Sequence, residues 1–309
     1  MNTSFHRIGF IGLGVMGEPI CSNLARKSGL PVMAFDLDPA PAQRLSAEGV
    51  QPASSPTELM SLCDLVFLSL PSGEVVDQLA RQPQGLLSLM RAGQVMVDTG
   101  TTSVQTTRTL AAACADRKAQ WVDAPVARTR AAAIAGTLSV MVGSPQALYA
   151  QLHPFLATFA EEITRCGESG AGQVVKILNN MVLFETVMAL GEARTMAERA
   201  GVDPALLFDT LTKGSADSFA LRSHGMKAIL PGDFPERAFS VRYALKDLRY
   251  ALEMAAQSDV DARGAQTVQG WFEAAIAAGL GDRYHPVIST LMGSQNGRKT
   301  GAQKDKEGR

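Results

Sequence analysis

The chain has 309 residues, a formal net charge of −1, 46% hydrophobic residues and 19% charged residues. This length allows two domains with hydrophobic cores, and the composition is that of an ordinary globular protein. The near-zero charge argues against nucleic acid or an anionic membrane surface as a partner, and we expect neither a secretory leader nor a run of about 20 apolar residues that would cross a bilayer.

The first half alternates short apolar strands with helical segments. The predicted strands are Arg7–Ile11, Val32–Phe35, Leu65–Leu68, Val95–Val97, Gln120–Val122 and Ser139–Val142. The predicted helices are Glu18–Ser28, Pro41–Glu48, Ser55–Ser61, Gly73–Arg81 and Val104–Arg117. This alternation predicts an α/β fold with a doubly wound, Rossmann-type parallel sheet.

The pattern changes after about Gly167, where only helices are predicted. They cover 171–199, 203–213, 218–230, 239–258 and 262–278. We therefore predict a dinucleotide-binding domain at 1–167, an all-helical substrate and dimerisation domain at 168–292, and a disordered tail at 293–309, which is almost free of apolar residues.

The cysteines and histidines point to no metal centre. No C-x-x-C pair exists, and no His lies at metal-ligand spacing from another His or Cys. We predict buried, reduced thiols in a cytoplasmic protein. The residues concerned are Cys21, Cys63, Cys114, Cys166, His6, His153, His224 and His285.

A glycine loop, G-x-G-x-x-G, follows the first predicted strand and opens the first helix. In this setting glycines allow the sharp turn, the approach of a pyrophosphate and close packing of helix on strand. Asp36 ends the next strand, with no Arg after it, so its carboxylate favours the free ribose of NAD over the 2′-phosphate of NADP. The predicted cofactor loop is Gly12, Leu13, Gly14, Val15, Met16 and Gly17.

The segment from 170 to 193 is apolar apart from one stripe. Gln173, Lys176 and Asn180 fall on one face of the predicted helix. A buried lysine without a partner is costly, so its presence needs a reason, although a lysine at a helix start often reaches solvent. We interpret Lys176 as the proton donor and acceptor beside a nicotinamide ring, with Asn180 orienting it or the substrate.

Five motifs in order resemble the β-hydroxyacid dehydrogenase family, which includes 3-hydroxyisobutyrate dehydrogenase and tartronate semialdehyde reductase. They are "GFIGLGVMG", "DAPV", "GTLSVMVG", "GAGQVVKILNN" and "LKDLRYALEMA", between residue 6 and about residue 292. The resemblance implies that Lys176 is catalytic and Asn180 orients the substrate. It also implies that Leu70, Pro71, Thr101 and Lys246 contact the cofactor, and that the protein is a homodimer or homotetramer.

One motif departs from the family pattern. Where the family has "DAPVSGG", this chain has Ala127, Arg128 and Thr129 in place of Ser-Gly-Gly. The Arg-Thr version resembles sulfolactaldehyde reductase and related short-chain semialdehyde reductases. A guanidinium suits a carboxylate or sulfonate, so we predict that Arg128 and Thr129 bind the substrate, while Arg130 stays solvated.

These features together predict an NAD-dependent oxidoreductase that acts on a small anionic aldehyde or hydroxy acid. Two alternatives stay open: an imine reductase, and a catalytically silent nucleotide-binding protein. Relatives that reduce imines usually carry another residue at the Lys176 position, and a silent relative would have lost Lys176 or Asn180. Both residues are present.

Overall fold

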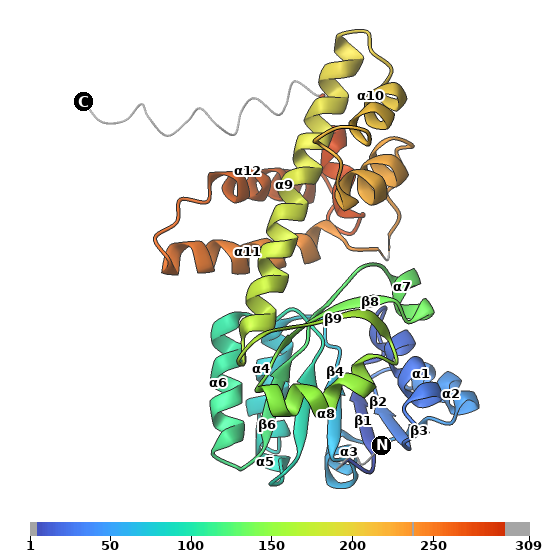
Figure 1. The fold of residues 1–309 in the computed structure, drawn as a ribbon, viewed down its shortest axis with the longest axis vertical. Coiled ribbons are helices and arrows are strands. Elements are labelled where there is room, and N and C mark those ends of the chain that lie inside the picture. Colours follow the sequence, from blue (N-terminus) through green and yellow to red (C-terminus); the bar gives the residue numbers. More distant parts are fainter. Residues whose placement is uncertain (1–4, 237, 294–309) are drawn as a thin grey trace. The chain divides into compact units, whose positions relative to one another are not determined.

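The computed structural model describes residues 5–236 and 238–293, which form two units. The division falls between Lys176 and Ile177, inside the long helix α9 (Ala171–Arg199). Figure 1 shows the sheet-containing first unit and the helical second unit. Of the predicted tail, only Gly293 belongs to the described residues.

The first unit is built on a nine-stranded sheet. Its strands are β1 (Ile8–Ile11), β2 (Val32–Phe35), β3 (Gln51–Pro52), β4 (Leu65–Leu68), β5 (Val95–Asp98), β6 (Gln120–Asp123), β7 (Val126–Ala127), β8 (Leu138–Gly143) and β9 (Ala160–Gly167). The parallel part has the order β3-β2-β1-β4-β5-β6, that of a Rossmann sheet. This confirms the predicted fold class, although β8 joins β6 antiparallel, so the sheet is mixed.

Helices cover both faces of this sheet because alternate strand residues point to opposite sides. Phe10 and Phe67 belong to a core with α1 and α8, whereas Ile11 and Leu68 belong to a second core with helices α3 to α6. The helices are α1 (Gly17–Lys27), α2 (Pro39–Leu45), α3 (Pro56–Leu62), α4 (Gly73–Arg81), α5 (Leu86–Leu89), α6 (Val104–Ala115), α7 (Arg130–Ala135) and α8 (Gln146–Leu156), with a 3-10 turn at Ser46–Glu48.

The sequence did not predict strands β3, β7 and β9 or helices α5, α7 and α8. Two of these strands have only two residues, and β9 is a mostly polar strand beside β8. Because β9 contains exposed glutamates, it lacks the regular alternation of apolar residues by which a strand is predicted from sequence.

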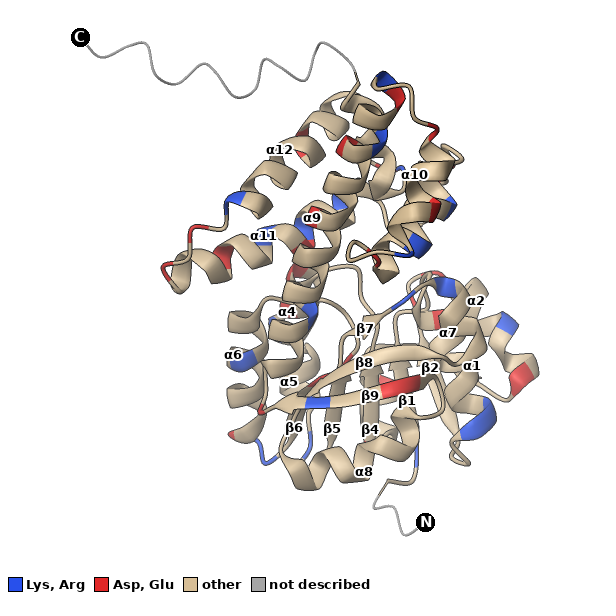
Figure 2. Cartoon of the chain, turned by 45° about the horizontal axis from the view of Figure 1, so that its top comes forward, with Lys and Arg blue, Asp and Glu red and all other residues tan. Residues whose placement is uncertain are grey.

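The second unit is helical, as predicted, around a core that includes Phe184, Phe208 and Phe272. After α9 come α10 (Pro204–Leu211), a π-helix (Leu221–Ile229), α11 (Val241–Gln257), α12 (Arg263–Ala277) and a 3-10 helix (His285–Leu291). Figure 2 shows acidic and basic residues interspersed on both units, in agreement with the near-zero net charge.

The expectation that no segment is long and apolar enough to span a membrane needs a correction. Within the described residues, α9 meets that criterion by length and composition, with a mean hydropathy of 1.4. α9 also contains polar residues such as Lys176 and Asn180, both of which are buried. The core helix of a globular protein passes the same test, so α9 is weak support for a membrane segment.

Candidate active site

The glycine loop between β1 and α1 leaves room for a ligand at one point only. A side chain at Gly12, where φ is +95°, would overlap the carbonyl oxygen of Ser69, and one at Gly17 would overlap the carbonyl oxygen of Gly12. A Cβ at Gly14, by contrast, would meet nothing within 4 Å. Two glycines are therefore required by the turn, and the third exposes backbone to an approaching pyrophosphate.

The start of α1 is also suited to an anion. Met16 precedes the helix and makes no side-chain cap, so the first N–H groups depend on other acceptors. The acidic Glu18 in this turn is paired with Arg44 at 2.8 Å, which offsets its charge. The residues present thus fit the phosphates of a dinucleotide.

Asp36 lies directly after β2 and is tied to the glycine loop. Its Oδ2 accepts a hydrogen bond from the N–H of Leu13 at 2.5 Å, and its Oδ1 accepts one from Asp38 at 2.8 Å. The carboxylate is therefore fixed at the end of β2, where the adenosine ribose binds in this fold. The next residue, Leu37, is 93% exposed and offers no cation.

The other residues predicted to contact the cofactor differ in their surroundings. The Leu13 side chain is buried in the core, so only its backbone remains at the loop, whereas Val15 is exposed. Leu70 and Pro71 follow β4, and Thr101 follows β5. These segments share the carboxyl edge of the parallel strands, where open α/β sheets bind ligands.

Asp123 supports the start of α9, a structural role that the sequence did not reveal. This fully buried carboxylate at the end of β6 accepts hydrogen bonds from the N–H groups of Gly170 at 2.7 Å and Gln173 at 2.9 Å. Burial raises the pKa of Asp123, against the effect of these donors. It caps the start of α9 from a distant strand, and a side chain at Gly143 or Gly172 would overlap it.

The polar stripe of α9 is buried, and several of its apolar residues are not. Gln173 is fully buried, and its amide accepts from the N–H of Thr102 and donates to the carbonyl of Gly100. Lys176 is 7% exposed and Asn180 is 1% exposed, yet Val175 and Leu178 are 42% and 39% exposed. Lys176 therefore does not reach solvent as a lysine at a helix start commonly does.

In the second unit, Asn180 is held by a residue that the sequence left unassigned. Its Nδ2 donates to Oδ2 of the buried Asp247 at 2.7 Å, and its Oδ1 accepts from Asn179 at 3.1 Å. Lys246 lies with its Nζ 3.1 Å from Oδ1 of the same carboxylate. Asp247 thus joins two of the predicted site residues through one side chain.

Lys246 is also placed between two aromatic rings. Its Nζ lies 5.6 Å from the ring centre of Tyr243 and 5.5 Å from that of Tyr250. Such contacts stabilise the cation and limit its rotation. Burial and the nearby Asp247 raise the pKa of Tyr243.

Arg128 adopts a conformation that glycine favours, and its guanidinium is partly engaged. Its φ is 86°, at the position where the related motif has Gly. Its Nη1 donates to the carbonyl of Thr137 at 2.6 Å and to Glu161 of β9 at 2.9 Å. Thr129 accepts from the N–H of Ala132 and caps α7, while Arg130 is exposed, with Glu18 at 3.9 Å.

Across residues 5–236 and 238–293, no three His, Cys, Asp or Glu residues gather in a way that could hold a metal ion. The four cysteines are free; Cys21, Cys63 and Cys114 are buried, and Cys166 is partly exposed.

Comparison with known proteins gives consistent matches along the chain. The NAD binding domain of 6-phosphogluconate dehydrogenase matches residues 7–167, and the NAD-binding family of NADP-dependent 3-hydroxyisobutyrate dehydrogenase matches residues 170–291. The 2-(hydroxymethyl)glutarate dehydrogenase of Eubacterium barkeri is 35% identical over 89% of this chain and 91% of its own length. The 2-hydroxy-3-oxopropionate reductase of Escherichia coli (strain K12) is 30% identical over 91% and 95%.

The fold is similarly close to a solved structure. The 3-hydroxyisobutyrate dehydrogenase of Mycobacterium tuberculosis with L-serine has a TM-score of 0.85 at 30% identity, covering 95% of this chain and 100% of that one. These matches agree with the Rossmann sheet, the open glycine loop and the helical second unit. The chain therefore belongs to the β-hydroxyacid dehydrogenase family of oxidoreductases, with an NAD(P)-binding Rossmann domain.

Proposed function

We propose that this protein is an NAD-dependent oxidoreductase that interconverts a small anionic hydroxy acid, or hydroxy sulfonate, and its semialdehyde. The observation that carries the proposal is the buried stripe of α9, where Lys176 shares one face with Gln173 and Asn180. An ammonium group is costly to bury, and family membership supports proton transfer as its role.

Each residue has a defined task in this proposal. Lys176 gives a proton to the carbonyl oxygen during reduction and takes it back during oxidation. Asn180, whose amide is fixed by Asp247, orients the substrate oxygen toward Lys176. A bound nicotinamide supplies the hydride to the carbonyl carbon.

Arg128 and Thr129 hold the anionic end of the substrate. Because Nη1 of Arg128 is used by Thr137 and Glu161, the guanidinium meets the substrate through Nε and Nη2. A planar guanidinium accepts either a carboxylate or a sulfonate. The likeness of this loop to sulfolactaldehyde reductase favours a three- or four-carbon substrate with such a group.

We propose NAD rather than NADP because Asp36 would repel a 2′-phosphate and no cation follows it.

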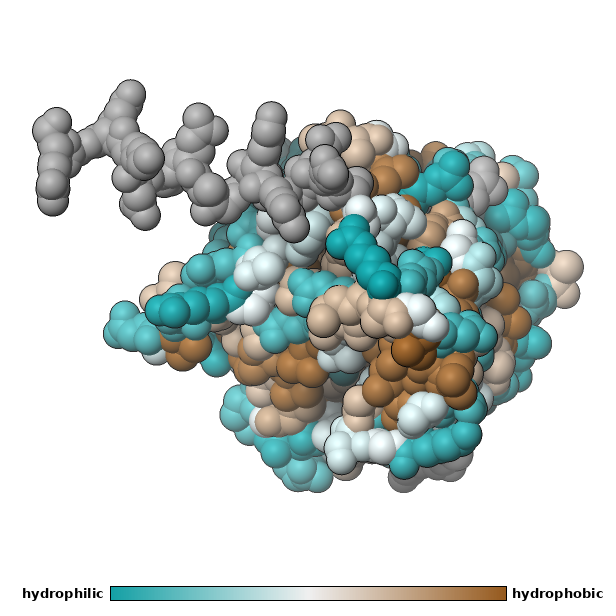
Figure 3. Space-filling model, turned by 90° about the horizontal axis from the view of Figure 1, so that it is seen from above, coloured by the Kyte–Doolittle hydropathy of each residue, from teal (hydrophilic) through white to brown (hydrophobic). Residues whose placement is uncertain are grey.

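We also propose a homodimer or homotetramer, since Val182 and Met196 of α9 are 57% and 70% exposed, and Figure 3 shows hydrophobic residues at the surface. We propose a cytoplasmic location because the four cysteines are free and three of them are buried.

The test is NADH oxidation with a panel of three- and four-carbon semialdehydes that includes sulfolactaldehyde and succinic semialdehyde. Turnover that is lost in Lys176→Ala supports the proposal. Turnover that depends on an added amine would instead indicate imine reduction, and NADH binding without any turnover would indicate a silent relative.

The same panel run with Arg128→Ala should show KM raised by roughly ten- to a hundredfold for anionic aldehydes, with NADH binding unchanged. An unmoved KM would remove Arg128 from the anion site.

A further inference from the structure

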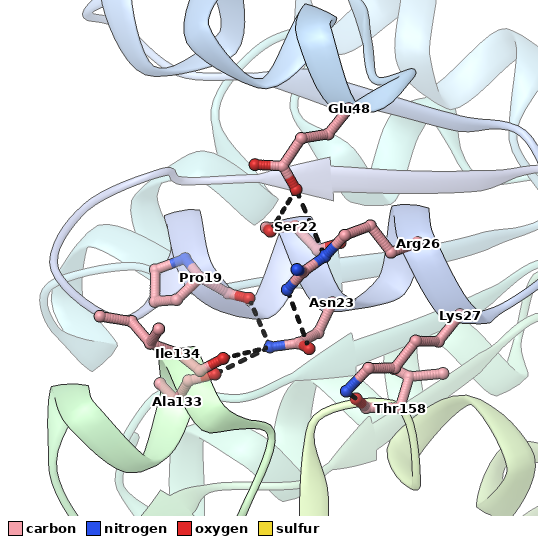
Figure 4. A network of polar contacts seen from close by, with 9 residues as sticks. All are labelled: Pro19, Ser22, Asn23, Arg26, Lys27, Glu48, Ala133, Ile134 and Thr158. Atoms are coloured by element: carbon pink, nitrogen blue, oxygen red, sulfur yellow. Dashed lines mark hydrogen bonds and ion pairs between the residues drawn. The ribbon is translucent and has the colours of Figure 1, made fainter.

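The short helix α7 follows Arg128 and Thr129 directly and packs against α1, the helix that the glycine loop opens. Figure 4 shows the polar contacts between these two helices. The segment proposed to bind the substrate is therefore attached to the helix proposed to bind the cofactor, inside one folded unit.

The attachment is made by one buried amide, that of Asn23 in α1. Asn23 is 1% exposed, and its Nδ2 donates to the carbonyls of Ala133 at 2.9 Å and Ile134 at 3.4 Å, besides Pro19 of its own helix at 3.1 Å. The last carbonyls of a helix have no partner within that helix. The N–H of Gly136 donates to the carbonyl of Ala133 at 3.3 Å, and Asn23 adds a partner for the carbonyls of Ala133 and Ile134 from another helix.

Gly136 ends α7 in the left-handed conformation, with φ +74°, which fixes where the chain leaves the helix. A second link, between Arg130 and Glu18 at 3.9 Å, is exposed at the arginine and therefore contributes little. Asn23 is thus the main polar attachment of α7 to α1. An apolar residue would fill the same space without bonding to α7, so packing alone does not require an asparagine here.

We propose that Asn23 is a positioning residue that fixes α7 on the cofactor helix and so holds Arg128 and Thr129 where they meet the substrate. This inference rests on the proposed function, which assigns the anionic end of the substrate to these two residues. Arg128 has a positive φ, a conformation that a residue with a side chain keeps only when its surroundings hold it. An unanchored α7 releases that constraint.

The test is Asn23→Asp, which keeps the shape of the side chain but replaces the Nδ2 donor by an oxygen that faces two carbonyls. KM for the anionic aldehyde should rise roughly ten- to a hundredfold, while kcat and the Kd for NADH change by less than about threefold. Hydrogen exchange of the amides in 131–136 should accelerate, whereas the amides of β1 and β4 stay protected. Asn23→Ser keeps a donor and should recover part of the KM.

Ser22→Ala is the matched control, since it removes only the bond from Ser22 to Glu48, one residue earlier on the same helix. Its KM should equal that of the wild type. Unchanged exchange in α7 would overturn the proposal, as would faster exchange with an unmoved KM or a parallel rise in the Kd for NADH. A wild-type protein without turnover would refute the proposed function alone, because the exchange experiment needs no substrate.

Discussion

The glycine loop and the polar face of α9, the two proposed binding regions, are built by opposite means. The loop works through missing side chains, and its open point at Gly14 is created by residues within a few positions along the chain. The face of α9 works through buried side chains that are held by distant residues, Asp123 for the start of the helix and Asp247 for Asn180. The first site is therefore sensitive to local changes, and the second to changes far away in the sequence.

Substitution of Lys176 should separate the two regions most clearly, because it affects the reaction at α9 and leaves cofactor binding at the glycine loop intact. Lys176→Ala should lower kcat by roughly a hundred- to ten-thousandfold, since the proton donor is lost, while the glycine loop still binds NADH with the wild-type Kd. Leu178→Ala is the control, because this residue lies on the same helix but is exposed. Single-turnover NADH oxidation separates chemistry from binding, and a kcat within about tenfold of the wild type would contradict the role of Lys176.

A second buried polar group extends the comparison to stability. His224 in the π-helix is 7% exposed, and its Nδ1 contacts the hydroxyl of Tyr284. Burial lowers the pKa of His224 to about 4. In the unfolded chain His224 takes up a proton near pH 6.5, whereas in the folded protein it does so only near pH 4. The free energy of unfolding therefore has its full value above pH 6.5 and falls by about 3 kcal/mol as the pH drops toward 4. The pKa of His285, lowered by its burial and by His224, acts in the same direction.

Urea unfolding followed by the fluorescence of Trp271 in a Trp121→Phe background reports on the helical unit alone, because the chain has two tryptophans. In the first unit the raised pKa of Asp123 has the opposite effect on the free energy of unfolding, because the folded state there favours the protonated carboxyl. A probe of the second unit alone therefore avoids this contribution. His224→Phe should make the loss of stability between about pH 6.5 and 4 less steep without abolishing it, because the buried His285 still contributes. An equally steep loss in that variant would show that His224 is not its cause.

The same contrast explains what could be predicted from the sequence. Six strands, the glycine loop, Asp36 and α9 follow from short-range patterns, because turns and helix faces depend on nearby residues. Asp123 and Asp247 looked like parts of motifs without a task, since their partners lie 47 and 67 positions away. The engagement of Arg128 by Glu161 escaped prediction for the same reason: β9, which brings Glu161 close, has no apolar pattern of its own.

Substitution of Asp247 tests directly whether Asn180 depends on a residue that is distant in the sequence. Asp247→Ala removes the acceptor that fixes the amide of Asn180 and should lower kcat roughly tenfold, with little change in the Kd for NADH. Asp247→Asn keeps an acceptor in place and should retain most of the activity. If both variants lose kcat equally, the charge beside Lys246 matters rather than the orientation of Asn180.

The smallest expected effect concerns Asp36 beside the glycine loop. Asp36→Ala should improve NADPH use relative to NADH by roughly tenfold in kcat/KM, because the repulsion of a 2′-phosphate is removed. The carboxylate also accepts the N–H of Leu13, so part of the loss with NADH comes from a looser glycine loop. Asp36→Asn separates the two causes, since it keeps an acceptor for Leu13 but carries no charge. Equal cofactor ratios in the wild type and Asp36→Ala would mean that Asp36 supports the loop without choosing the cofactor.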